Sequence, residues 1–166
     1  MIHVIENFTK DGYAVKTLVG HFGQLNGYVG IPINKYRNMV EKGFCYYNDI
    51  YCHGGVTFSE QGSFPKQVLK INSSGKLSFT EVDKQLFDAQ YFWLGFDTAH
   101  HYDSADKDYL EAILSKEDFE SVIQYTTNFQ FMGSGPIRTH AYVMENINDM
   151  LTQIKEFNKE IKKEEV

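Results

Sequence analysis

The chain has 166 residues, of which 42% are hydrophobic and 23% are charged, and these figures exclude a disordered, collagen-like or coiled-coil chain. Aromatic residues are unusually frequent, at 15%. The formal net charge is -6 and no basic stripe is present, so nucleic acid is not an expected partner. A small phosphorylated ligand remains compatible with this charge, because backbone N–H groups and one or two arginines can hold it.

The cysteine content and the first residues indicate the compartment. Cys45 and Cys52 are too few for a disulfide scaffold and form no CxxC motif. No signal-peptide pattern and no segment as long as a membrane span is present. We therefore expect a reduced, cytosolic protein without a membrane partner. It should form a single domain over 1–166, with a charged, frayed tail over about 159–166.

Strands are predicted through the first two-thirds of the chain. Alternating apolar residues predict a strand over 13–19, and the continuous apolar run 91–96 predicts a central strand buried on both faces. A short strand at the start, a turn or short helix over 34–42 and a hairpin around 72–75 are also expected. Further strands are predicted over 25–31, 49–58, 67–71 and 76–82.

The last third is predicted to be helical. Ser115 and Asp118 have the spacing of a capping box for a helix over 116–125, after a short helix over 106–114. A break over 133–136 precedes Thr139, a good N-cap for the last helix. That helix has one apolar stripe, formed by Val143, Ile147, Met150, Leu151, Ile154 and Phe157. The predicted fold class is therefore α+β: a mostly antiparallel sheet with a C-terminal amphipathic helix packed on one face.

The segment 51–58 contains two successive glycines inside a predicted strand. Gly54 and Gly55 have no side chain to pack there, so they indicate a bulge or a place where a ligand approaches the backbone. His53 and Thr57 flank the pair and can donate hydrogen bonds. The alternative is a β-bulge beside a purely structural histidine.

The segment 91–103 runs from an apolar strand into a polar cluster. Asp97, His100 and Asp103 follow one another at steps of three, with His101 beside them, and the ends of strands commonly present functional groups. The alternative is local capping, with Asp97 in a turn, Asp103 or Ser104 at a helix start, and both histidines exposed.

Three chemistries can be weighed if the two segments meet: acid–base catalysis, ligand binding and a metal site. His53 and His100, tuned by Asp97, could act as acid and base on a phosphodiester, or His, Thr and Gly donors with aromatic stacking could bind a nucleotide. The HxxD and DxxH spacings lack the helical spacing of HExxH, so neither a metal nor another cofactor is expected. A cysteine nucleophile is poorly supported, because Cys52 and His53 would point to opposite faces of a strand.

Two residues outside these segments are further candidates. Arg138 precedes the last helix and could pair with a phosphate or a carboxylate, although such an arginine is often a solvated end group. Tyr28, in the Gly27–Gly30 stretch, could line a pocket or belong simply to a strand.

The residues GYVGIP at 27–32, HGGVTF at 53–58 and FWLGFD at 92–97, with His100 and Asp103, resemble motifs of a family of small phage and prophage proteins. Members carry GYV.(V/I)P, HGG(L/V)T(F/Y) and (W/F)W(L/I)GFDxxHxxD, and end in an amphipathic helix. The likeness spans Gly27 to about Phe157. This chain departs from the family at Thr98, where Cys is frequent, and at 101–102, where His-Tyr replaces an Ala-Gly-like pair.

The resemblance implies a viral origin, an α+β fold and a place in the cytoplasm of the infected bacterial host. By analogy with other small acidic phage proteins, we expect a counter-defence protein that binds and sequesters a cyclic dinucleotide or an ADP-ribose derivative without catalysis. A homo-oligomer that closes the pocket is also expected. The expected ligand-binding residues are His53, Gly54, Gly55, Thr57, Asp97, His100, Asp103, Tyr28 and Arg138.

Two other functions compete with sequestration. One is a metal-independent, phosphodiesterase-like hydrolase in which His53 and His100 are the catalytic residues. The other is an inhibitor that binds a host protein and has no small-molecule site, since the aromatic excess suits an interface core.

Overall fold

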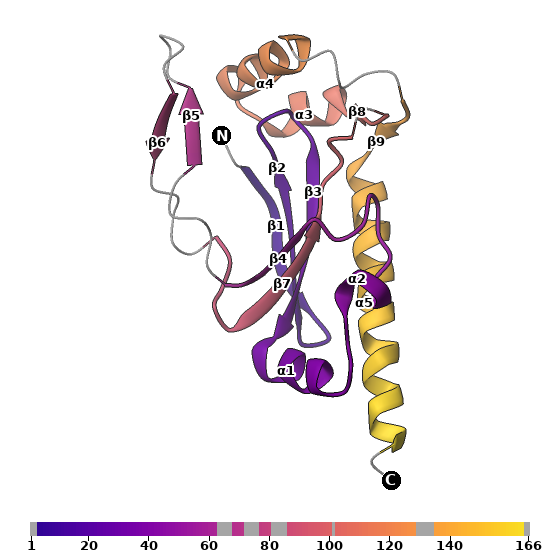
Figure 1. Ribbon diagram of the computed structural model, residues 1–166. Coiled ribbons are helices and arrows are strands. Elements are labelled where there is room, and N and C mark those ends of the chain that lie inside the picture. Colours follow the sequence, from indigo (N-terminus) through magenta and orange to yellow (C-terminus); the bar gives the residue numbers. More distant parts are fainter. Residues whose placement is uncertain are drawn as a thin grey trace.

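A five-stranded antiparallel sheet forms the centre of the molecule (Figure 1). The computed structural model describes residues 3–62, 68–71, 77–80, 86–100, 102–128 and 135–164. The spatial order of the strands is β1-β2-β3-β7-β4, and all four pairings are antiparallel. Their bounds are His3–Lys10 for β1, Tyr13–Val19 for β2, Leu25–Pro32 for β3, Tyr91–Phe96 for β7 and Phe58–Gln61 for β4.

Five helices and two small sheets complete the described chain. The helices are α1 (Ile33–Glu41), α2 (Tyr46–Asp49), α3 (Lys107–Ile113), α4 (Lys116–Asn128) and α5 (His140–Glu164). One small sheet is the antiparallel pair β5 (Val68–Ile71) and β6 (Leu77–Thr80). The other is the parallel pair β8 (Ser104–Ala105) and β9 (Ile137–Arg138). The predicted α+β fold class is confirmed.

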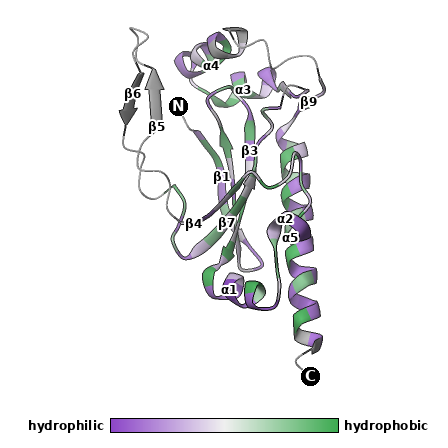
Figure 2. Cartoon of the chain, in the orientation of Figure 1, coloured by the Kyte–Doolittle hydropathy of each residue, from purple (hydrophilic) through white to green (hydrophobic). Residues whose placement is uncertain are grey.

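The main core lies between the sheet and α5. Val29 and Leu94 face the helix and are fully buried, and the predicted apolar stripe of α5 is buried against them. Hydrophobic (green) and hydrophilic (purple) stretches both recur along α5, as expected of a helix with one apolar face (Figure 2). Burial of such a stripe is the dominant favourable term for this helix, at roughly 25 cal/mol per Å² of apolar area.

A second hydrophobic cluster covers the other face of the sheet. It consists of Ala14, Leu18, Tyr28, Phe87 and Trp93. Because Trp93 belongs to this cluster while Leu94 and Phe96 belong to the main core, β7 is buried on both faces. The prediction of a central strand over 91–96 is therefore confirmed.

The predicted strand over 49–58 is wrong. Residues 46–49 form the single turn α2, which the Asp49 carboxylate closes by accepting from the Cys45 N–H at 2.6 Å. Residues 50–57 then run as a loop, and β4 begins only at Phe58. Gly54 and Gly55 have φ values of 66° and 83°, which lie outside the range of a regular strand.

The charged tail expected over about 159–166 is helical for most of its length. Helix α5 continues through Glu164, and Ile161 within it is only 5% exposed. The predicted turn at 72–75 and part of the predicted break at 133–136 lie outside the described residues, although both arms of the hairpin are present as β5 and β6. Among the described helices, none combines the length and the apolarity needed to span a membrane.

The start of α5 provides a first prediction. The Tyr142 N–H donates to the Thr139 hydroxyl at 3.1 Å, so Thr139 is the N-cap that the sequence indicates. Replacing Thr139 by Ala should lower the free energy of unfolding by about 1 kcal/mol, measured by urea denaturation. Thr139→Ser keeps the acceptor and serves as the control. A loss of similar size in both variants would contradict the capping role.

Candidate functional site

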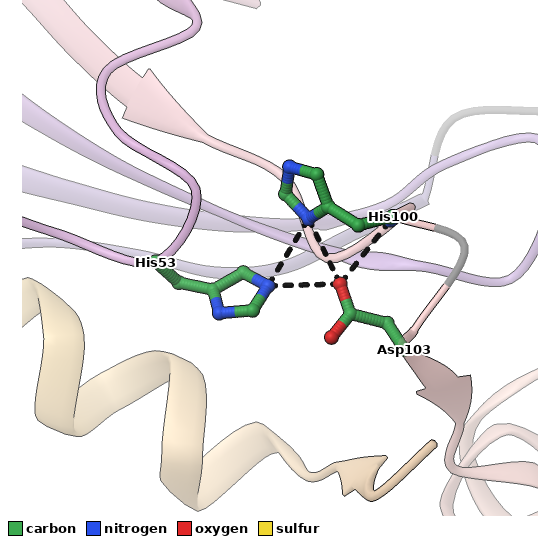
Figure 3. Close-up of side chains that lie close together, drawn as sticks. All are labelled: His53, His100 and Asp103. Carbon is green, nitrogen blue, oxygen red and sulfur yellow. Dashed lines mark hydrogen bonds and ion pairs between the residues drawn. The ribbon is translucent and has the colours of Figure 1, made fainter. Parts of the chain in front are cut away.

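Three polar side chains from two separate segments meet at one point. His53 belongs to the loop between α2 and β4, whereas His100 and Asp103 belong to the loop after β7, and all three point toward one another (Figure 3). His53 Nε2 lies 2.8 Å from Asp103 Oδ2, and His100 Nδ1 lies 2.9 Å from the same oxygen. The two imidazole nitrogens are 3.2 Å apart. We call these three residues the His–His–Asp cluster.

Asp103 is fully buried and ionised. Its second oxygen, Oδ1, accepts from Arg138 Nε at 2.6 Å. Burial alone would raise the pKa of Asp103, but the hydrogen bonds from Arg138, His53 and His100 outweigh it and hold the pKa at about 2. Arg138 is thus paired with a buried carboxylate and is not a solvated end group. Nor does Asp103 cap a helix, since Asp106 caps α3.

The two glycines have different roles beside the cluster. A Cβ added to Gly54 would lie 2.3 Å from His100 Cε1, so the imidazole packs where a side chain would otherwise be. A Cβ on Gly55 would meet nothing within 4 Å. Both residues have positive φ, so both conformations favour glycine. The close approach that the Gly-Gly pair indicates is therefore made by His100, a residue of the same chain.

Helix α5 fixes the position of His53, which the sequence did not indicate. The His53 N–H donates to Asn146 Oδ1 at 2.9 Å, and His53 Nδ1 lies 2.9 Å from the Tyr142 hydroxyl. Gln153 bonds both the N–H and the C=O of Tyr51. The three residues of α5 are Tyr142, Asn146 and Gln153, four and seven positions apart and next to the apolar stripe. This spacing is the feature of the sequence that indicates a contact between this face of the helix and another segment.

His100 is the accessible member of the cluster. Its side chain is 25% exposed, compared with 5% for His53 and 0% for Asp103. The Tyr102 ring stacks on it with an interplanar angle of 6° and a centroid distance of 5.2 Å. Its second nitrogen, Nε2, points away from His53 and Asp103 and has no hydrogen-bond partner among the described residues (Figure 3).

Other predicted site residues make contacts outside the cluster. The Thr57 hydroxyl donates to Asp97 Oδ2 at 3.2 Å, while Asp97 Oδ1 accepts from the Ala99 N–H, the local turn that was the alternative interpretation. Tyr28 is 7% exposed and its ring packs edge-on against Phe58 and Phe87. Within the described ranges no hydrogen bond joins these residues to the cluster. His101 lies outside the described residues.

A cavity of about 720 Å³ lies elsewhere in the molecule, beside the second hydrophobic cluster. It is lined in part by Phe8, Lys16 and Trp93, and by none of the predicted site residues. Two further lining residues, Gly62 and Phe87, stand close to the segment 63–85, which is outside the described ranges apart from β5 and β6. The cavity therefore gives no independent indication of a site.

The thiol of Cys52 does not have the properties of a nucleophile, although Cys52 directly precedes His53. Its thiol is free, and burial raises its pKa to about 11. Iodoacetamide should therefore modify Cys52 at pH 8 much more slowly than it modifies free cysteine, and the rate should rise steeply toward pH 11. Peptide mass spectrometry of a time course, with free cysteine as the reference, measures this. A rate at pH 8 equal to the reference would contradict it.

Comparisons with known proteins give no family for this chain. No family model matches it, and no match was found among curated proteins or among solved structures. The site must therefore be interpreted from its own geometry.

Proposed function

We propose that the protein binds and sequesters a phosphorylated, nucleotide-type small molecule at the exposed side of the His–His–Asp cluster. The observation that carries the proposal is the position of His100. Its Nδ1 is held by a buried carboxylate, its Nε2 has no described partner, and its ring is a quarter exposed. In its protonated form such an imidazole donates to Asp103 from one nitrogen and to a phosphate oxygen from the other.

Neighbouring groups support a nucleotide rather than a simple anion. Tyr102, which stacks on His100, is 43% exposed and adds an aromatic surface of the kind on which a base stacks. Tyr51 is 75% exposed two residues before His53 and provides a second aromatic surface.

The family resemblance points to the biological setting of this proposal. In it, the protein is a phage counter-defence factor in the cytoplasm of the infected host, and the ligand is a cyclic dinucleotide or an ADP-ribose derivative. Sequestration without catalysis requires slow release, and a second copy of the chain over Tyr102 would provide it.

A specific observation favours hydrolysis as a second candidate function. A buried carboxylate that holds one imidazole nitrogen leaves the other as a general base, as in the catalytic dyads of many hydrolases. His53 does not share this role, because Nδ1 faces the Tyr142 hydroxyl and Nε2 faces Asp103. Hydrolysis would therefore use His100 alone, in contrast to the pair of histidines expected from the sequence.

One experiment separates the two functions. The protein is incubated with a panel of cyclic dinucleotides and with ADP-ribose, then denatured by heat, and the small molecules are analysed by mass spectrometry. Intact ligand released only on heating supports sequestration, whereas cleaved ligand supports hydrolysis. His100→Gln should abolish either result, and His3→Gln on the edge strand β1 should not.

Thermal-shift measurements on the same panel test the proposal as a whole. Ligand at a hundredfold excess over its Kd should stabilise the protein by about 2.7 kcal/mol. If no nucleotide raises the melting temperature, neither function holds and a host protein becomes the expected partner.

A further inference from the structure

We propose that His53 Nε2, His100 Nδ1 and Asp103 Oδ2 bind one divalent first-row transition-metal ion, and that Zn²⁺ matches the site well. These three atoms converge within 4.8 Å of one another. The proposal goes beyond the function above, because it concerns a metal ion and stands whether or not a nucleotide binds.

The spacing of the three atoms fits one ion. The distances between them are 2.8, 2.9 and 3.2 Å. Ligand atoms at 2.0–2.1 Å from a tetrahedral Zn²⁺ lie about 3.4 Å apart, so an outward shift of a few tenths of an ångström places all three in the coordination shell. Two imidazole nitrogens favour Zn²⁺, Co²⁺, Ni²⁺ or Fe²⁺ over Mg²⁺ and Ca²⁺, which take oxygen ligands.

The contacts around Asp103 Oδ2 also favour an ion. Both imidazole nitrogens lie within 2.9 Å of Asp103 Oδ2, which also accepts from the His100 backbone N–H at 3.2 Å. Three nitrogens therefore surround one carboxylate oxygen that has two lone pairs. An ion between the three ligand atoms would take one lone pair from each ring nitrogen and one from the oxygen.

The surrounding residues have the arrangement of outer-shell groups in metal sites. Tyr142 lies at the non-ligating nitrogen of His53, and Arg138 bonds the non-ligating oxygen of Asp103. Such contacts fix the tautomer of a ligating histidine and the orientation of a ligating carboxylate. The Asp103 N–H also donates to the His100 carbonyl at 2.9 Å, so two of the ligands are held in one turn.

The site would have an open coordination position. Three protein ligands with a free fourth position are typical of ions that take water or a substrate, and not of purely structural ions. His100 is the only one of the three ligands with substantial exposure, so access is from its side. Since Arg138 already balances the charge of Asp103, the ion would keep its positive charge and favour an anion at that position.

Metal titration tests the inference directly. The full-length protein is stripped with EDTA, desalted and titrated with Zn²⁺ by calorimetry, and Co²⁺ is followed by its visible absorption. We expect one ion per chain and tetrahedral Co²⁺ bands. His53→Gln and His100→Gln should each weaken Zn²⁺ binding at least 100-fold, while Tyr142→Phe should weaken it about tenfold. His3→Gln is the matched histidine control and should bind as the wild type does.

A measurement on the wild-type chain guards against variants that do not fold. In ¹⁵N NMR of the imidazoles, Zn²⁺ should shift Nε2 of His53 and Nδ1 of His100, and should leave His3 and His140 unchanged. Absence of saturable binding at one ion per chain would overturn the inference. So would wild-type affinity in a folded His100→Gln protein, or Zn²⁺ shifts confined to other histidines.

Discussion

Replacing Asp103 by Ala should lower the free energy of unfolding by about 3 kcal/mol. The substitution leaves the Arg138 guanidinium, 17% exposed, without its partner, and removes the acceptor that the two imidazoles share. Loss of one member of a buried ion pair typically costs about 3–5 kcal/mol, and the partial exposure of Arg138 places this case at the lower end. Urea denaturation followed by circular dichroism measures the change.

Two further variants define the origin of that loss. Asp108→Ala removes an exposed carboxylate from the first turn of α3 and should change the stability by no more than about 0.5 kcal/mol. Removing both partners, in Asp103→Ala with Arg138→Leu, should restore part of the stability, because no unpaired charge remains. A loss below about 1 kcal/mol for Asp103→Ala would contradict a stabilising role of the ion pair with Arg138.

Gly54→Ala and Gly55→Ala should have different effects although the two glycines are adjacent. Both have positive φ, so a Cβ at either position introduces backbone strain of about 1–2 kcal/mol. Only at Gly54 does the new methyl group also strike the His100 ring, at 2.3 Å. Gly54→Ala should therefore cost about 1–2 kcal/mol more, since the imidazole must leave its hydrogen bond to Asp103.

The two glycine variants also distinguish backbone strain from a change in the position of His100. Gly55→Ala should keep the wild-type chemical shifts of His53 and His100, whereas Gly54→Ala should move both. Urea denaturation and ¹⁵N NMR of the imidazoles give the two readouts. Equal losses of stability with unchanged His100 shifts in both variants would contradict the packing role assigned to Gly54.

Much of the fold follows from local patterns. The alternation of apolar residues over 13–19 predicts the bounds of β2 correctly. For α5, the N-cap Thr139 predicts the start of the helix, and the apolar stripe predicts its buried face. The prediction of a strand over 49–58 is wrong because the Asp49 side chain closes a turn there, which the apolar residues before the glycines do not indicate. Helix α5 extends past the expected start of the charged tail, and Ile161 continues its buried stripe.

The candidate site was only partly predictable. His53, His100 and Asp103 stood out because polar groups beside glycines or at a strand end are seldom needed for packing. Tyr28 belongs to the second hydrophobic cluster, and its sequence pattern is the same for a tyrosine that lines a pocket and for one in a core. The contacts that hold the cluster in place come from Arg138, Tyr142 and Asn146, which bond residues 35 to 93 positions away. No local pattern in the sequence indicates contacts over such separations.

The same long-range assembly couples occupancy of the site to the integrity of the whole molecule. Four stretches of chain meet there: the loop at His53, the turn from His100 to Asp103, strand β9 and the first turns of α5. A molecule bound at their junction gains its affinity only while all four are docked, so its binding energy adds to global stability. Under the proposed function, heating, proteolysis or detachment of α5 should therefore release a bound ligand in the same cooperative step that unfolds the protein.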